Sequence, residues 1–267
     1  GEIKPDVIVA DSVAYWGKLT AMKYGIPFVS STTTFAFNKY SAKLMKQGAV
    51  DIAKMMFKMP KVNAQIKRLQ AEGYPVKGIL EIIQNDNETN TIVYTSDYYQ
   101  PCADTFSDRY HFIGPSIRPI ETPIEKTAEK TVYISLGTVN KNEEFYKNCE
   151  AAFADTPYQV ILAKGEEHFI DQMAALSIAD VFITHCGMNS ASEGLYFETP
   201  LLLFPQTNEQ NAVAERTMQL GAGIGLDDIS PQNILASTEE LLNNSTYKEC
   251  AVKISESFKR SGGVQEA

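Results

Sequence analysis

The sequence predicts an α/β protein built from two doubly wound domains, in which helices cover both faces of parallel sheets. Three observations predict this fold class. Short runs of β-branched and aliphatic residues alternate with helical segments along most of the 267 residues. Helical segments of this length between strands favour right-handed crossovers and parallel pairing. A proline-rich stretch of mixed charge at 118–130 is expected to link the two domains.

The first half, residues 1–117, contains the less regular elements. Asp6–Ala10 is β-branched and apolar and predicts a buried strand. A helix should follow and end near Tyr24, before Gly25, with Trp16 packed between that helix and the sheet. The remaining segments are predicted as strands at 28–30, 91–96 and 110–114 and a mostly helical region at 36–86.

The second half, residues 131–267, alternates more cleanly. Each apolar run is short enough for a strand, and each amphipathic run between two of them is long enough for a helix. The predicted strands are 131–136, 158–163, 180–184, 200–204 and 223–226. The predicted helices are 142–153, 172–178, 189–197, 208–220, 231–243 and 246–260.

The composition excludes several classes of function. Lysine and arginine number 24 against 33 aspartates and glutamates, a formal net charge of −9, so binding to nucleic acid is not expected. No run of about 18 apolar residues exists, so no membrane insertion is expected. The four cysteines form no C-x-x-C pair, and the first residues do not resemble a signal peptide. These features favour a cytoplasmic enzyme with reduced thiols.

The most informative stretch begins after the predicted strand 180–184, whose carboxyl end carries His185. A turn with one flexible residue, Gly187, leads into a helix that Asn189 and Ser190 are expected to cap. A helix start at the end of a parallel strand presents free N–H groups and a partial positive charge. His185 can donate a hydrogen bond, and Gly187 permits close approach of the backbone. The pattern predicts an anion site suited to phosphate.

Further polar residues are expected at the same sheet edge. Glu193, one turn into the helix, is an acceptor suited to a sugar diol, and Glu209 and Gln210 begin the helix after the next strand. Glu193 could instead pair on a helix face, and Glu209 with Gln210 could be an ordinary polar first turn. A Cys–His nucleophile or a zinc site at His185 is disfavoured, since adjacent residues diverge and no second ligand has metal spacing.

The spacing H-C-G-M-N-S-x-x-E, followed by P-Q-x-x-x-Q, resembles the donor-binding signature of UDP-sugar-dependent glycosyltransferases of GT-B fold. The subgroup resembled is that of bacterial macrolide- and flavonoid-modifying enzymes. The segment 169–180 is also similar, with Asp171 where that family usually has proline. The resemblance implies two Rossmann-like domains: an incomplete acceptor-binding domain at 1–117 and a donor-binding domain at 131–267.

The same resemblance implies a role for each matching residue. Phe169 would stack on uracil, Gln172 would lie at the edge of the base, and Glu193 would hold the ribose hydroxyls. Alternatively, Phe169 is a core residue and Gln172 an ordinary surface glutamine. The diphosphate would be held by Thr138, His185, Gly187, Asn189 and Ser190, and the sugar hydroxyls by Glu209 and Gln210. No metal and no cofactor are implied; the UDP-sugar is a co-substrate.

The implied reaction transfers a hexose, glucose in the first place, to a hydroxyl of a hydrophobic small molecule with inversion. A histidine acts as base, and Asp11 matches the aspartate that orients it, although Asp11 could instead cap the next helix. The family's histidine precedes the segment that begins at Gly1, so we expect upstream sequence, and a loop near 165–168, to be missing. The rivals are a non-catalytic nucleotide-sugar-binding fragment and, less favoured, a UDP-sugar epimerase.

Overall fold

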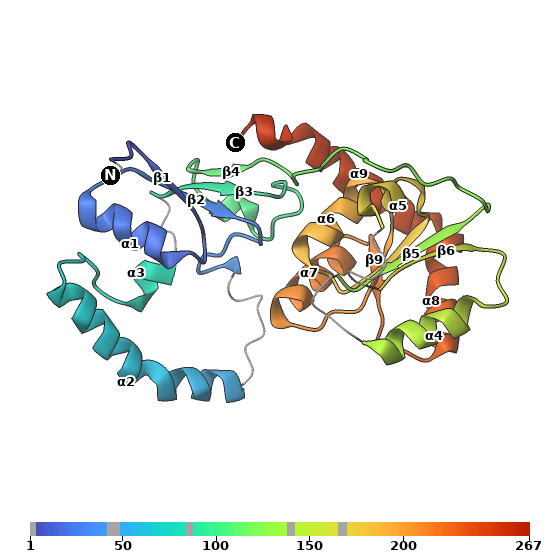
Figure 1. The fold of residues 1–267 in the computed structure, drawn as a ribbon, viewed down its shortest axis with the longest axis horizontal. Coiled ribbons are helices and arrows are strands. Elements are labelled where there is room, and N and C mark those ends of the chain that lie inside the picture. Colours follow the sequence, from blue (N-terminus) through green and yellow to red (C-terminus); the bar gives the residue numbers. More distant parts are fainter. Residues whose placement is uncertain (1–3, 42–48, 84–87, 138–141, 165–169) are drawn as a thin grey trace. The chain divides into compact units, whose positions relative to one another are not determined.

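The structure, a computed structural model, describes residues 4–41, 49–83, 88–137, 142–164 and 170–267. The chain forms two compact units (Figure 1). Unit 1 contains residues 1–113 with the last three residues, and unit 2 contains residues 114–264. Among the described residues, no helix combines the length and the apolar character needed to cross a membrane.

Unit 1 has a four-stranded parallel sheet in the order β1-β2-β3-β4. Its strands are β1 (Ile8–Asp11), β2 (Phe28–Thr32), β3 (Asn90–Val93) and β4 (Tyr110–Phe112). Its helices are α1 (Tyr15–Tyr24), α2 (Ala49–Ala71), α3 (Ile79–Ile83) and the 3₁₀ turn η2 (Ala103–Thr105). Because all four strands are parallel, their carboxyl ends share one edge, where Asp11 ends β1.

Two predictions for unit 1 are wrong. The first strand is not buried: β1 pairs only with β2 among the described residues, and Val9 is 59% exposed. Trp16 does not pack between helix and sheet, because its side chain is 74% exposed. An apolar sequence pattern shows that a residue can be buried, not that a neighbour covers it. A strand at the edge of a sheet, or a helix beside that edge, buries only the side chains that other elements cover.

Unit 2 has a five-stranded parallel sheet in the order β6-β5-β7-β8-β9. The strands are β5 (Thr131–Ser135), β6 (Gln159–Ala163), β7 (Val181–Thr184), β8 (Leu201–Leu203) and β9 (Gly223–Gly225). The helices are α4 (Glu143–Phe153), α5 (Gln172–Ile178), α6 (Met188–Tyr196), α7 (Asn208–Gln219), α8 (Pro231–Asn243) and α9 (Ser245–Arg260), followed by the 3₁₀ turn η3 (Gly263–Gln265). Every strand and helix predicted for this half is present, within a few residues.

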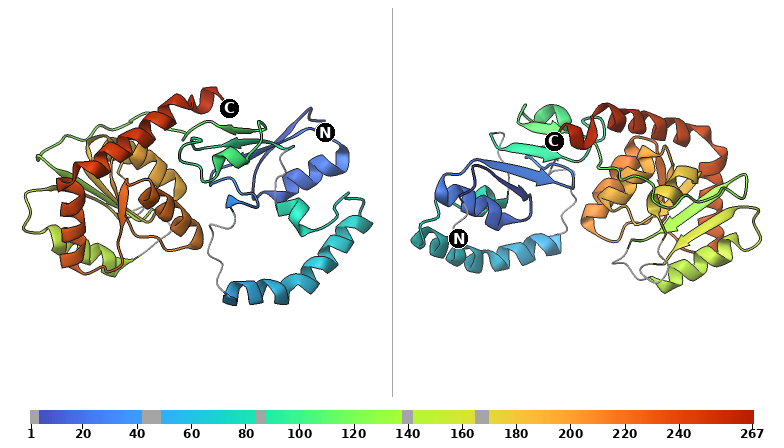
Figure 2. Two further views of the ribbon diagram at one scale, coloured as in Figure 1. Left: turned by 180° about the vertical axis from the view of Figure 1, so that it is seen from behind. Right: turned by 45° about the horizontal axis from the view of Figure 1, so that its top comes forward.

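The helices of unit 2 form two layers around its sheet (Figures 1 and 2). Helix α4 packs with α8, and α6 packs with α5, α7 and α9. The central strands are buried throughout, which explains why their sequences are continuous apolar runs without alternation. Aromatic pairs strengthen the core: Tyr133 stacks on Phe182 with ring centres 4.8 Å apart, and Phe145 on Phe204 at the same distance.

Candidate functional site

The topology of unit 2 places a switch point at the carboxyl ends of β5 and β7. The chain leaves β5 for β6 on one side and then crosses to β7 on the other side of β5. In open α/β sheets, ligands bind outside the strand ends at such a switch point. The residues that follow the two strands are Leu136 and Gly137 after β5, and His185 and Cys186 after β7.

The His185 ring lies between two glycines at this switch point. A methyl group on Gly187 would lie 2.6 Å from Nε2 of His185, and one on Gly137 would lie 2.9 Å from Cε1. Neither glycine could carry a side chain without moving the ring. Gly187 is not the flexible residue of the turn, because its φ is −59°; the left-handed residue is Cys186, with φ of 65°. Gly187 is therefore required for space around His185 rather than for its backbone conformation.

His185 is set up as a neutral hydrogen-bonding group. Burial lowers its pKa below the ordinary histidine value, and an interaction with the Ser135 backbone opposes that shift by a smaller amount. Its Nδ1 is buried and has no hydrogen-bond partner among the described residues. A neutral imidazole offers one donor and one acceptor, so this ring can hydrogen-bond a ligand without carrying charge at neutral pH.

The start of α6 leaves its first backbone N–H groups without a side-chain acceptor. Its N-cap is Gly187, and Asn189 and Ser190 lie within the first turn instead of capping the helix as predicted. The other α-helices of unit 2 all have side-chain caps in the described structure: Asn142, Asp171, Thr207, Ser230 and Asn244. Free N–H groups at the positive end of the helix dipole make this helix start the place in unit 2 best suited to an anion.

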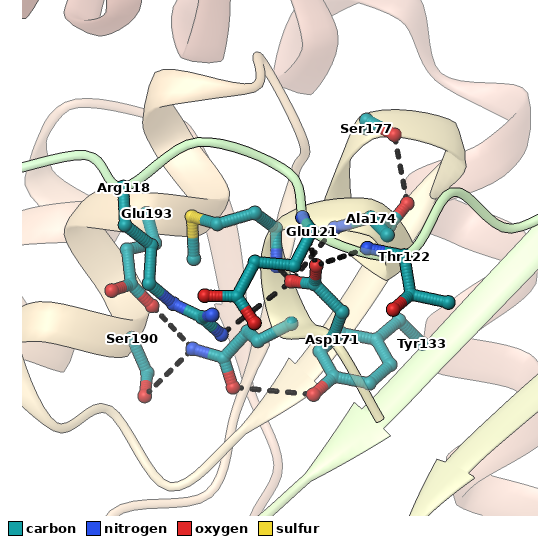
Figure 3. A network of polar contacts seen from close by, with 11 residues as sticks. Arg118, Glu121, Thr122, Tyr133, Asp171, Ala174, Ser177, Ser190 and Glu193 are labelled. Atoms are coloured by element: carbon teal, nitrogen blue, oxygen red, sulfur yellow. Dashed lines mark hydrogen bonds and ion pairs between the residues drawn. The ribbon is translucent and has the colours of Figure 1, made fainter. Parts of the chain in front are cut away.

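A second cluster lies further along α6, where the Gln172 side chain joins α5 to α6 (Figure 3). Its Nε2 donates to Oε2 of Glu193 and, at 3.4 Å, to Oγ of Ser190. Its Oε1 accepts a 3.2 Å hydrogen bond from the Tyr133 hydroxyl. The structure thus brings together Gln172 and Glu193, the two residues assigned to the edge of the base and to the ribose.

Glu193 is a poorly hydrated carboxylate with unused acceptor capacity. Burial raises its pKa, while the hydrogen bond from Gln172 and the positive charge of Arg118 lower it by less. A desolvated carboxylate gains more from each new hydrogen-bond donor than a fully hydrated one does, because little water is displaced. Neighbouring hydroxyls, such as those of a sugar diol, are suitable donors.

Sequence reasoning missed the role of Asp171 and Arg118. The Asp171 side chain is 1% exposed and caps α5, accepting from the N–H groups of Met173 and Ala174. Its other oxygen accepts from the linker N–H groups of Glu121 at 2.7 Å and Thr122 at 3.1 Å. The Arg118 guanidinium lies 3.5 Å from Oδ1. The available signal was an aspartate at a position where the resembled family usually has proline.

The remaining predicted residues of unit 2 fall in two groups. Glu209 is exposed at the start of α7, and the Gln210 Oε1 accepts the Gln206 N–H at 2.7 Å, next to the Thr207 cap. Since β8 pairs with β7, α7 begins at the same edge as His185. Thr138 and Phe169 lie outside the described residues, as does the segment 165–168. In the described ranges, no group of three or more His, Cys, Asp or Glu could hold a metal ion.

Asp11 belongs to unit 1, where it is exposed at the carboxyl end of β1. Its Oδ1 accepts the Val13 N–H at 2.9 Å, but the N-cap of α1 is Ala14. Asp11 therefore orders the turn before the helix without capping it, and its second carboxylate oxygen has no hydrogen bond to a described residue.

Comparison with known proteins identifies the family. The family model for the erythromycin biosynthesis protein CIII-like C-terminal domain matches residues 151–262. An uncharacterized UDP-glucosyltransferase of Bacillus subtilis (strain 168), YdhE, is 34% identical over 274 residues, which cover 94% of this chain and 69% of YdhE. A second one from the same organism, YojK, is 32% identical over 98% of this chain and 71% of its own length.

Solved structures agree with the sequence relatives. The crystal structure of the glycotransferase of kitacinnamycin superposes with a TM-score of 0.84 at 27% identity, covering 97% of this chain and 74% of that one. CalG4, the calicheamicin glycosyltransferase, superposes with a TM-score of 0.79, also at 27% identity, over 97% of this chain and 72% of its own. The chain therefore belongs to the UDP-glucosyltransferase-like glycosyltransferases of GT-B fold, the macrolide- and flavonoid-type family that its sequence resembles.

Proposed function

We propose that this glycosyltransferase uses a UDP-hexose, with glucose as the first candidate, and glycosylates a hydroxyl of a hydrophobic small molecule. The names of the relatives YdhE and YojK, both UDP-glucosyltransferases, support the donor. The family model and the kitacinnamycin enzyme carry the names of natural products, which supports a small-molecule acceptor such as a macrolide or a flavonoid. Unit 2 holds the donor in this proposal.

The observation that carries the proposal is the uncapped start of α6 beside the His185 ring at the switch point. The diphosphate binds there, held by backbone N–H groups of the first turn, by His185 and by the side chains of Asn189 and Ser190. Glu193 holds the ribose hydroxyls next to Gln172, and Phe169 stacks on the base. Thr138 completes the phosphate loop after β5, and Glu209 with Gln210 hold the hexose hydroxyls.

The proposed reaction is a direct displacement. The acceptor oxygen forms a bond to the anomeric carbon while the bond from that carbon to the phosphate oxygen breaks, so the configuration inverts and UDP leaves. The acceptor proton passes to a histidine base, and Asp11 orients that histidine and stabilises its charge. No metal is invoked, since a helix dipole and hydrogen-bond donors offset charge on the departing diphosphate.

The donor site is tested by titrating the protein with UDP-glucose. Glu193→Ala and His185→Ala are each expected to weaken binding roughly tenfold or more, because each removes a partly buried hydrogen-bonding partner of the ligand. Glu256→Ala is the control, since Glu256 is an exposed residue of α9 paired only with Arg260 in the described structure. Calorimetry provides the measurement. Unchanged affinity in both site variants would reject the assigned roles.

Donor affinity is expected to rise as the pH falls from about 8 to about 6. The lowered pKa favours the neutral ring in the free protein, and a bound diphosphate favours the protonated ring. Binding is therefore coupled to proton uptake, and UDP-glucose suits the measurement because its phosphates have no pKa in this range. His185→Asn should abolish the trend. A trend that persists in the variant would assign the proton to another group.

The role of Asp11 is tested by turnover in the protein expressed from its complete gene, with flavonols and macrolides as acceptors. Asp11→Ala is expected to lower kcat on the order of 10²-fold or more, because the base loses its partner, while UDP-glucose affinity stays unchanged. A retained rate would remove Asp11 from the mechanism. Donor binding by the wild type without transfer to any acceptor would favour the rival, a non-catalytic nucleotide-sugar-binding protein.

A further inference from the structure

A cation from the linker reaches the donor site of unit 2. Arg118 lies at the start of the proline-rich stretch, and its side chain extends from the linker into the space between Asp171 and Glu193 in the view of Figure 3. Its side chain is 42% exposed, so it can meet a ligand as well as the protein. Arg118 and both of these residues belong to unit 2, so their arrangement is internal to one compact unit.

The position of Arg118 is fixed by Asp171. The guanidinium Nη2 lies 3.5 Å from Oδ1 of Asp171, and the same carboxylate accepts two N–H groups of the linker just after Arg118. Asp171 also caps α5, the helix that begins with Gln172. One buried carboxylate therefore holds the linker, the Arg118 side chain and the start of α5 in place. Gln172, the first residue of α5, is in turn hydrogen-bonded to Glu193.

Arg118 is one of the groups that affect the charge of the Glu193 carboxylate. The groups that lower the pKa of this carboxylate are the Gln172 amide of α5 and Arg118 of the linker. The carboxylate in turn contributes to the raised pKa of the Tyr133 hydroxyl of β5. The Asp171 carboxylate lies on the side of the guanidinium opposite Glu193 in Figure 3 and already accepts four backbone N–H groups. Arg118 is the cation that opposes the effect of burial on Glu193 in the described structure. An ionised carboxylate accepts hydrogen bonds on both oxygens, whereas a protonated one carries a donor on one of them.

We propose that Arg118 is a positioning residue of the donor site, which orients the Glu193 carboxylate to accept the ribose hydroxyls. This inference rests on the proposed function, because it assumes that the ribose of the nucleotide lies at Glu193. Asp171 provides the anchor: it orders Arg118 from one side while α5 orders Gln172 from the other. The linker is then part of the donor site as well as a connection between the domains.

The experiment compares wild type, Arg118→Met and Arg118→Lys by calorimetric titration with UDP-glucose. Methionine keeps the apolar stem and removes the charge, and lysine restores the charge. Lys126→Met is the matched control, since Lys126 is a half-exposed linker cation that pairs with Asp180 at 2.7 Å. Melting temperatures of all variants show whether each one is folded. Dividing each Kd by the wild-type Kd at the same pH removes the contribution of His185, which is present in both proteins.

Arg118→Met is expected to weaken binding roughly twofold to fivefold near neutral pH, the range for a partly exposed charge pair. The ratio should grow toward about pH 5.5, because without the arginine Glu193 takes up its proton at a higher pH. Arg118→Lys should recover most of the loss, and Lys126→Met should bind like wild type. At about pH 7.5 the loss should be smaller for 2′-deoxy-UDP than for UDP, since the deoxy compound lacks one of the hydroxyls.

Two results would overturn the inference while leaving the donor site intact. One is wild-type affinity in Arg118→Met at every pH, together with weakened binding in Glu193→Ala. The other is an equal loss for UDP and 2′-deoxy-UDP with a constant ratio across pH, which would assign Arg118 to the phosphates. Failure of the wild type to bind UDP-glucose, or unchanged binding in Glu193→Ala, would instead overturn the proposed function and this inference with it.

Discussion

Gly187→Ala is expected to weaken UDP-glucose binding roughly ten- to hundredfold while the protein stays folded. The added methyl group would lie 2.6 Å from His185 Nε2, so the ring must move away. It cannot move toward Gly137 without meeting the backbone of that residue, because the ring already lies where a Gly137 side chain would be. The variant loses the histidine hydrogen bond and crowds the first turn of α6, where the diphosphate is proposed to bind. Calorimetric titration measures the effect.

The backbone at Gly187 makes this prediction specific for binding. Its φ of −59° and ψ of 137° are conformations that alanine adopts without strain, and the atom it would meet is at the end of a side chain. The melting temperature should therefore change little. Gly78→Ala is the control, because a methyl group there meets nothing within 4 Å. Wild-type affinity in Gly187→Ala would show that His185 does not need its present position to hold the donor.

The sequence predicted the elements of unit 2 and the edge at which we propose the donor site, because these depend on local patterns. Continuous apolar strands and amphipathic helices fix a parallel sheet, and parallel strands bring His185 and the start of α7 to one edge. The signature spacing then placed Glu193 one turn into α6. Residues that directly follow a strand can be placed from the sequence in this way, since short βα connections leave their backbone little freedom.

The errors arose where contacts distant in sequence decide the outcome. Asp171 meets the linker about 50 residues away, and no local pattern shows that its carboxylate caps a helix and binds two linker N–H groups at once. The left-handed residue of the turn was predicted to be Gly187, because glycine is the usual residue in that conformation, but it is Cys186. Gly187 instead leaves space for the His185 ring, which lies where a side chain on Gly187 would be. Exposure of Trp16 depends on what covers α1, which its own sequence does not encode.

Asp171→Ala is expected to lower the free energy of unfolding of unit 2 by about 2–3 kcal/mol. The loss of the α5 cap accounts for about 1 kcal/mol of this. The rest follows because the Glu121 and Thr122 N–H groups lose their acceptor and Arg118 loses its partner. Denaturant unfolding measures the change. UDP-glucose affinity should also fall, since the start of α5 and Gln172 lose their anchor.

Ser230→Ala separates the two contributions. Ser230 caps α8 in the same unit by accepting a hydrogen bond from the Asn233 N–H and has no hydrogen bond to the linker among the described residues, so its loss should cost about 1 kcal/mol. The difference between the two variants in free energy of unfolding estimates the contribution of the linker contacts.

Burial raises the Asp171 pKa, but four backbone N–H groups lower it by more, so the net shift is downward. Its contribution is therefore complete above the unfolded pKa of about 3.9 and is lost as the pH falls through the folded pKa. The gap between wild type and Asp171→Ala should narrow in acid; a gap of constant size would show that the carboxylate charge plays no part.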